Sequence, residues 1–128
     1  MRVFIADDSV IFRKVLTSSI AECRGAEVVG EAENASDAVE AINRLRPDLV
    51  ILDIRLKAGT GIDILHSIKK NETGMPKTIV LTNFPYDQYR RVTISLGADY
   101  FFHKATQFSD FVSVLRGLVA QPNAELAA

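Results

Sequence analysis

The chain has 128 residues, of which 48% are apolar, and 15 lysines and arginines stand against 16 aspartates and glutamates. These values indicate one compact domain with a core, and they exclude an intrinsically disordered chain. The formal net charge of −1 argues against direct binding of nucleic acid, which needs an excess of lysine and arginine.

The cellular compartment is indicated by the cysteine content and by the N-terminus. Cys23 is the only cysteine, so no internal disulfide can form, which fits a reducing compartment. The apolar stretch at the N-terminus stops at Asp7 and Asp8, which is far short of an export signal or of the ~20 residues that span a membrane. We therefore expect a cytoplasmic protein without membrane insertion.

Strands and helices are expected to alternate from the N-terminus. Residues 3–6 form an apolar run of strand length, and a stripe with helical spacing follows at Val10, Ile11, Val15 and Ile20. Residues 27–30 form the second strand-like run. Asn34 and Asp37 then resemble a helix-capping pair before a stripe at Ala38, Val39, Ile42 and Leu45. Pro47 is expected to stop that helix.

The same alternation continues through the second half. Residues 49–52 form a third strand-like run, and Ile62, Leu65 and Ile68 mark a third helix. Residues 78–81 precede a helix marked by Tyr89, Val92 and Leu96, which Gly97 is expected to end. Residues 100–102 form the fifth run. The last apolar stripe comprises Phe108, Phe111, Val112, Leu115, Leu118 and Val119.

This alternation predicts an α/β fold in which helices cover both faces of a five-stranded, doubly wound parallel sheet, a three-layer sandwich. Right-handed crossovers leave few arrangements. Five strand–helix units in about 120 residues then point, as an inference at the level of the fold, to the small doubly wound fold with strand order 2-1-3-4-5. We expect the domain to span residues 1–120. Residues 121–128 lack apolar periodicity and are expected to form a loose tail.

Chemistry-bearing residues stand at the predicted strand ends. Asp7 and Asp8 follow the first strand, and Asp53 follows the third, while Thr82 and Lys104 end the fourth and fifth. Ligands of such sheets bind beyond the carboxyl ends of the strands where the strand order reverses, here between strands one and three. Clustered carboxylates need a cation, and hard oxygen ligands favour Mg²⁺ or Mn²⁺. With a lysine and a hydroxyl nearby, such a site suits transfer of a phosphoryl group to a carboxylate.

Taken together, these motifs resemble the receiver domain of bacterial two-component response regulators, a flavodoxin-like fold. The matching residues are the pair Asp7-Asp8, Asp53 after LVIL, Gly61, Thr82 after TIVL, Gly97-Ala98-Asp99 and Lys104. The resemblance covers the chain from Val3 to about Val119.

The resemblance implies a role for each site residue. Asp53 would be the phosphoacceptor, and Asp7, Asp8, Asp53 and the backbone carbonyl of Arg55 would hold the metal ion. Thr82, Lys104 and Asn83 would lie around the phosphoryl group. Thr82 and Phe101 would form the switch, in which Phe101 fills space vacated by Thr82 from an exposed starting position.

Three residues depart from the family pattern. Lys57 and Ala105 stand where the family commonly has proline, and Asn83 stands where a small residue is usual. We expect a trans peptide bond before Ala105, because a cis bond there would cost ~3 kcal/mol. We also expect Arg55 and Asn83 to set the lifetime of the phosphoryl group.

The resemblance further implies a regulatory domain rather than an enzyme, acting on its own through partners. The phosphoryl donor would be a histidine kinase or a histidine phosphotransfer protein. The output would pass through the face made by helix four, strand five and helix five, where possible contacts are Tyr86, Tyr89, Arg90 and Arg91. Two alternatives are a receiver-like module that works without phosphorylation and an aspartyl-phosphate phosphohydrolase. The phosphohydrolase pattern DxDxT is absent after the first strand.

Overall fold

The structure, a computed structural model, describes residues 1–68 and 75–120 of the chain. In this part of the chain, strands and helices alternate in the order β1 (Arg2–Ala6), α1 (Val10–Ala21), β2 (Glu27–Ala32), α2 (Ala35–Leu45), β3 (Leu49–Leu52), α3 (Gly61–Ile68), β4 (Lys77–Thr82), α4 (Asp87–Ser95), β5 (Tyr100–His103) and α5 (Phe108–Ala120). The expected tail at residues 121–128 lies outside the described residues. None of the helices within the described ranges has the length and apolar character needed to cross a membrane.

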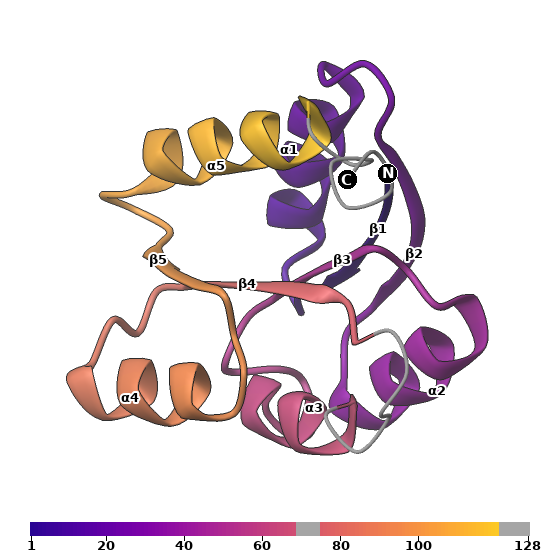
Figure 1. Cartoon of the computed structure of the whole chain (residues 1–128). Coiled ribbons are helices and arrows are strands. Elements are labelled where there is room, and N and C mark those ends of the chain that lie inside the picture. The colour runs from indigo at the N-terminus through magenta and orange to yellow at the C-terminus, as the bar shows by residue number, and fades with distance from the viewer. Residues whose placement is uncertain (69–74, 121–128) are drawn as a thin grey trace.

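All strands lie parallel in one five-stranded sheet with the order β2-β1-β3-β4-β5. Helices α1 and α5 cover one face of this sheet, and α2, α3 and α4 cover the other (Figure 1). The predicted fold and strand order are therefore confirmed. Every predicted strand is present, and all except β3 extend one or two residues beyond the predicted bounds.

Two apolar clusters form the core because successive residues of a strand point to opposite faces of the sheet. Val3 and Ile5 pack in the same cluster as Phe111 of α5. Phe4, between them, packs in the other cluster with residues of α2 and α3. The side chains of β3 are buried on both faces, which explains its continuous apolar run.

The helix ends follow the local sequence signals. Ser9 begins α1, where its hydroxyl accepts a hydrogen bond from the Phe12 N–H at 3.1 Å. Asn34 begins α2 and accepts from the Asp37 N–H at 2.9 Å, so the predicted capping pair is confirmed. Such a cap contributes about 1 kcal/mol. Arg46 ends the helix with a left-handed backbone (φ 48°) just before Pro47.

The predicted apolar stripe of α1 is wrong for three of its four residues. Ile20 is buried, but Val10, Ile11 and Val15 are 51%, 78% and 41% exposed. The core face of α1 instead carries Leu16 and Ile20, because residues four apart lie on the same side of a helix. This helix has apolar residues on two sides, and only packing against the sheet selected one of them.

Candidate functional site

The central strands bring the three aspartates to one edge of the sheet. β1 and β3 are neighbours in register, with Ala6 opposite Leu52. The ladder continues past the strand, since the Asp53 N–H donates to the Ala6 carbonyl at 2.9 Å. On the other side, the Asp7 N–H donates to the Ala32 carbonyl of β2 at 3.0 Å. The backbone of both aspartates is therefore held by the sheet itself.

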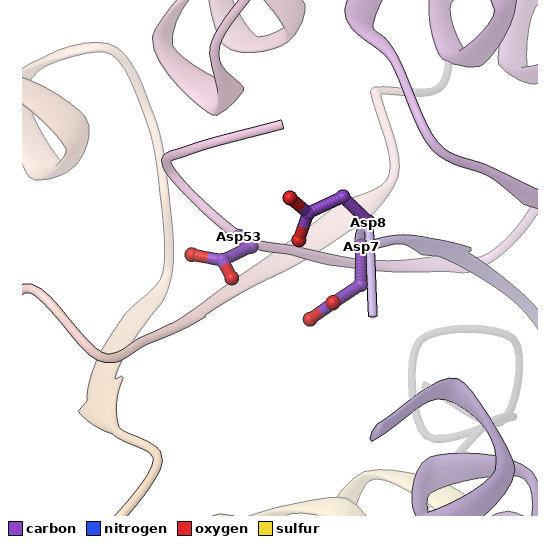
Figure 2. A group of neighbouring side chains, drawn as sticks. All are labelled: Asp7, Asp8 and Asp53. Carbon is purple, nitrogen blue, oxygen red and sulfur yellow. The ribbon is translucent and has the colours of Figure 1, made fainter. Parts of the chain in front are cut away.

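The carboxylates of Asp7, Asp8 and Asp53 form a compact cluster. Each offers one oxygen, and these oxygens all lie within 4.8 Å of one another. Figure 2 shows Asp7 and Asp8 at the end of one strand and Asp53 at the end of its neighbour. Asp7 and Asp53 are buried, whereas Asp8 is exposed. Carboxylate oxygens at this spacing are the donor set that a hard divalent cation such as Mg²⁺ or Mn²⁺ prefers.

Lys104 places a positive charge inside this cluster. Its Nζ lies 2.7 Å from Asp7 Oδ2 and 2.8 Å from Asp53 Oδ2, and only 8% of its side chain is exposed. The Lys104 N–H donates to the Thr82 carbonyl at 2.8 Å, which continues the pairing of β5 with β4. The other oxygen of the Asp53 carboxylate accepts from the Ile54 N–H at 2.7 Å. Asp53 is thus oriented through both of its oxygens.

Burial and pairing act in opposite directions on these charges. Burial raises the pKa of Asp7 above its ordinary value and outweighs the hydrogen bonds from Lys104 and the Ser9 N–H, which lower it. Burial also lowers the pKa of Lys104, but the hydrogen bonds to Asp53 and Asp7 and the negative charges of these two groups together outweigh it, so the pKa lies above its ordinary value. The lysine therefore stays charged. Its ammonium pairs with two of the three clustered carboxylates, Asp7 and Asp53, which leaves the site attractive to a further cation.

Thr82 lies at the end of β4, next to β5. It is buried, and its backbone pairs in register with His103, the residue before Lys104. Its Oγ1 accepts a hydrogen bond from the Phe84 N–H at 3.0 Å. A hydroxyl that accepts one hydrogen bond still has its own proton to donate, so Thr82 can serve an acceptor while it holds the loop that leads to α4.

Arg55 lies in the loop that follows β3, and Asn83 lies in the loop that follows β4. The Arg55 guanidinium lies over the Phe84 ring, 4.2 Å from its centroid. This contact joins the loop after β3 to the loop after β4. Asn83 is exposed. The sequence pattern did not predict a role for Phe84, which contacts both Arg55 and Thr82. Its position two residues after Thr82 was the one local feature that could have suggested it.

Phe101 does not occupy the exposed position expected from the sequence. It is only 4% exposed and packs in the core cluster below α4. The guanidinium of Arg90, from α4, lies 4.9 Å from the centroid of its ring. The expectation is wrong because strand alternation turns Tyr100 outwards and Phe101 inwards, and Arg90 then covers the ring.

Gly61 lies directly beneath the backbone of Asp53. A Cβ atom at this position would stand 2.3 Å from the Asp53 carbonyl oxygen and 2.7 Å from the Leu52 Cδ1. The Gly61 N–H donates to the Ile54 carbonyl at 2.8 Å. The residue is thus a glycine because α3 begins in contact with the chain that carries Asp53.

The loops that depart from the family pattern have regular contacts. The Lys104–Ala105 peptide bond is trans, as expected. Gln107 closes the following turn, since its Oε1 accepts from the His103 N–H at 2.9 Å and its N–H donates to the His103 carbonyl at 2.9 Å. The Lys57 N–H donates to the Glu33 carbonyl at 2.9 Å. These hydrogen bonds give both loops a defined path without the usual prolines.

Comparison with known proteins matches residues 3–116 to the response regulator receiver domain family. The chain is 33% identical over 106 residues to a protein-glutamate methylesterase/protein-glutamine glutaminase 1 from Methanospirillum hungatei JF-1, covering 81% of this chain and 31% of that protein. It is 27% identical over 116 residues to the response regulator protein VraR of Staphylococcus saprophyticus, covering 91% of this chain and 55% of that protein. The chain thus spans about half of the length of VraR and about a third of the length of the methylesterase/glutaminase.

A solved structure of a receiver domain has the same fold. The response regulator domain of Thermotoga maritima CheB superposes with a TM-score of 0.82 at 26% sequence identity, covering 94% of both chains. The match spans nearly all of the described sheet and helices and includes the cluster of three carboxylates with its lysine. The chain therefore belongs to the response regulator receiver domain family.

Proposed function

We propose that this receiver domain is a phosphorylation-controlled switch that accepts a phosphoryl group on Asp53 with the help of Mg²⁺. The observation that carries the proposal is the Lys104 ammonium, 2.8 Å from Asp53 inside the cluster of three carboxylates. The donor would be a phosphohistidine of a histidine kinase or a phosphotransfer protein. An Asp53 oxygen forms the new bond to phosphorus, while the bond from phosphorus to the histidine nitrogen breaks and that nitrogen keeps the electron pair.

The chain's own groups stabilise the charge that this transfer moves into the site. Asp7, Asp8 and Asp53, with the Arg55 carbonyl, would hold Mg²⁺, whose charge neutralises phosphoryl oxygens when it is bound. Lys104 supplies a second positive charge beside Asp53, and Thr82 supplies a hydroxyl donor. The Ile54 N–H keeps the Asp53 carboxylate in one orientation, so little reorganisation is needed before attack.

Incubation with Mg²⁺ and acetyl phosphate, followed by intact-mass measurement, tests this function. We expect one phosphoryl adduct on the wild-type protein, its loss when EDTA removes the metal, and its absence in Asp53→Asn with the fold retained by circular dichroism. Asp110→Asn, a change of an exposed carboxylate in α5, is the control. An adduct that persists in Asp53→Asn would contradict Asp53 as the acceptor.

Metal binding has its own prediction, centred on Asp8. At ten times the dissociation constant, Mg²⁺ is expected to stabilise the wild-type protein by about 1.4 kcal/mol, a rise of roughly 5 °C in melting temperature. Asp8→Asn should abolish this rise while it leaves the metal-free protein as stable or more stable. The reason is that Asp8 is exposed and adds only repulsion to the metal-free cluster. Thermal melts at several Mg²⁺ concentrations measure it, with Glu40→Gln on α2 as the control. An equal rise in wild type and Asp8→Asn would refute the metal site.

The lifetime of the phosphoryl group is expected to depend on Arg55, Asn83 and Phe84. Because Arg55 stacks on Phe84, Arg55→Ala and Phe84→Leu should change the rate of dephosphorylation in the same direction and by more than twofold. Asn83→Ala should also change it, since Asn83 is exposed and directly follows Thr82 in the chain. Phosphoryl loss followed by intact mass measures the rates. Lys57→Ala, in the loop of Arg55, is the control and should match wild type. Lifetimes within twofold of wild type in all three variants would contradict the prediction.

The output is proposed to pass from Thr82 to α4. Thr82 already binds the Phe84 N–H at the entry to α4, so a hydrogen bond from its hydroxyl to a phosphoryl oxygen would pull on the same loop. Arg55 and Arg90 extend this network to the rings of Phe84 and Phe101. Tyr86 is 54% exposed and lies 5.8 Å from the Tyr89 ring, so both remain candidates for contact with a partner protein. The face of α4, β5 and α5 is the proposed docking surface.

A regulatory domain explains the site better than the two alternatives. A module that works without phosphorylation would not need a lysine buried between two carboxylates, as Lys104 is, because such a cluster costs desolvation energy. A phosphohydrolase is not favoured because the family match covers the receiver domain alone. We therefore propose no enzyme activity for this domain beyond transfer of the phosphoryl group to itself.

A further inference from the structure

Lys104 has a third neighbour that the proposed chemistry does not use. Its Nζ lies 4.2 Å from the centroid of the Phe12 ring, above the ring face. Phe12 belongs to the first turn of α1, on the opposite side of the sheet from α4 (Figure 1). An ammonium within about 6 Å of a ring centroid is attracted by the negative face of the ring. The ring that makes this contact belongs to a helix, and it is not part of the carboxylate cluster.

The ring of Phe12 is itself held in place. The Phe108 ring, at the start of α5, meets it edge to face with centroids 6.0 Å apart and planes at 79°. Phe108 in turn lies 5.4 Å from Phe111, which is fully buried. The Phe12 N–H is bound by the Ser9 hydroxyl at the beginning of α1. The ring face is therefore presented to Lys104 by two helices and a buried aromatic cluster.

We propose that Phe12 is a positioning residue that holds the Lys104 ammonium in place for phosphoryl transfer to Asp53, an inference that rests on the proposed function. Among the residues that the structure describes, the two other partners of the ammonium are Asp7 and Asp53. Both are groups that the proposed function assigns to the metal ion and the phosphoryl group. The ring contact alone is independent of what occupies the site.

The chemical need for such a support follows from the lysine side chain. Lysine is a point charge at the end of a flexible four-carbon stem, and a charge that stabilises a transition state acts best when it is already in position. Once another ligand takes a carboxylate partner, one of the contacts that hold the end of this flexible stem is lost. Attraction by the face of the Phe12 ring holds the ammonium in place without occupying a carboxylate oxygen.

The proposal is tested by changing the ring's charge distribution separately from its shape. Phe12→Leu removes the ring, Phe12→Tyr keeps a ring face, and 3,4,5-trifluorophenylalanine at position 12 keeps the shape but withdraws electron density from the face. Phe4→Leu, in the core cluster on the other side of the sheet, is the control for a general loss of stability. Thermal melts of each variant show that it is folded.

The first readout is the proton NMR spectrum of Lys104 without any phosphoryl donor. Protons above an aromatic face are shifted upfield, so we expect shifted side-chain resonances of Lys104 in wild type, Phe12→Tyr and Phe4→Leu. The shift should disappear in Phe12→Leu. Unshifted Lys104 resonances in the wild-type protein would overturn the proposal, whatever the outcome of the phosphorylation assay.

The second readout is the rate of adduct formation with acetyl phosphate at saturating Mg²⁺. We expect Phe12→Leu to be slower than wild type by roughly 3- to 30-fold. The trifluorophenylalanine protein should lie between them, and Phe12→Tyr and Phe4→Leu should stay within twofold of wild type. A trifluorophenylalanine protein as fast as wild type would overturn the proposal, since shape alone would then suffice. Failure of the wild-type protein to form any adduct would instead overturn the proposed function, so the two failures are distinguishable.

Discussion

Replacing Lys104 with alanine is expected to lower the free energy of unfolding by about 3 kcal/mol in the absence of divalent metal. Removal of one partner of a buried ion pair leaves the other charge without compensation, and here two carboxylates, Asp7 and Asp53, lose the same ammonium. The loss should be partly relieved by protonation, because burial already raises the pKa of Asp7. A loss of this size corresponds to a fall of roughly 10 °C in melting temperature.

Metal is expected to reverse much of that loss. Mg²⁺ should raise the melting temperature of Lys104→Ala by more than it raises that of wild type, because the cation then neutralises carboxylates that no lysine balances. Phosphorylation of Asp53 should still be slow, since the second positive charge is missing. Denaturant unfolding with and without Mg²⁺ measures both effects.

The matched control for Lys104 is Lys57→Ala. The Lys57 side chain is 75% exposed and its Nζ lies 3.7 Å from Glu33, so its removal should cost less than about 1 kcal/mol and show no dependence on Mg²⁺. Equal stability of Lys104→Ala and wild type without metal would contradict the electrostatic account of the site.

Gly61→Ala is expected to destabilise the domain by about 3 kcal/mol. The added Cβ would stand 2.3 Å from the Asp53 carbonyl oxygen, a backbone atom that cannot turn away. Either α3 or the chain at Asp53 must shift, and such overpacking costs about 1–3 kcal/mol or more. Because Asp53 is part of the carboxylate cluster, the same variant should bind Mg²⁺ more weakly than wild type.

Gly117→Ala on α5 provides the control for this prediction. A Cβ at Gly117 has no atom within 4 Å, so alanine should stabilise the helix by about 0.5–1 kcal/mol. Chemical denaturation gives the stabilities and Mg²⁺ titrations give the affinities. A Gly61→Ala protein that unfolds with the wild-type midpoint would show that the contact with Asp53 is easily relieved.

Much of the fold was predictable because its signals are local. The alternation of short apolar runs with helical stripes indicated every strand. The order β2-β1-β3-β4-β5 was inferred at the level of the fold, from five strand–helix units joined by right-handed crossovers. Asn34 and Asp37 marked the beginning of α2 because a cap is formed by residues three apart. The meeting of Asp7, Asp8 and Asp53 followed from that topology, since the pair Asp7-Asp8 and Asp53 follow the ends of two neighbouring central strands.

The contact of Arg90 with the Phe101 ring and the exposed residues of α1 could not be predicted in the same way. Val10, Ile11 and Val15 are apolar and helically spaced, yet they face outwards. An apolar pattern shows that a helix has a core face, but where two patterns overlap, only packing against the sheet chooses between them. Phe101 is covered by Arg90 of α4, and no residue pattern within β5 predicts that contact.

What the sequence by itself determined is the succession of strands and helices along the chain and the type of group at the end of each strand, because both depend on residues near one another in the chain. Only the tertiary structure decided the contacts around the charges. The Phe12 ring under Lys104 and the Phe84 ring under Arg55 join segments from different elements. The physical reason is that such contacts depend on the rotation and separation of packed helices and loops, which no local spacing specifies.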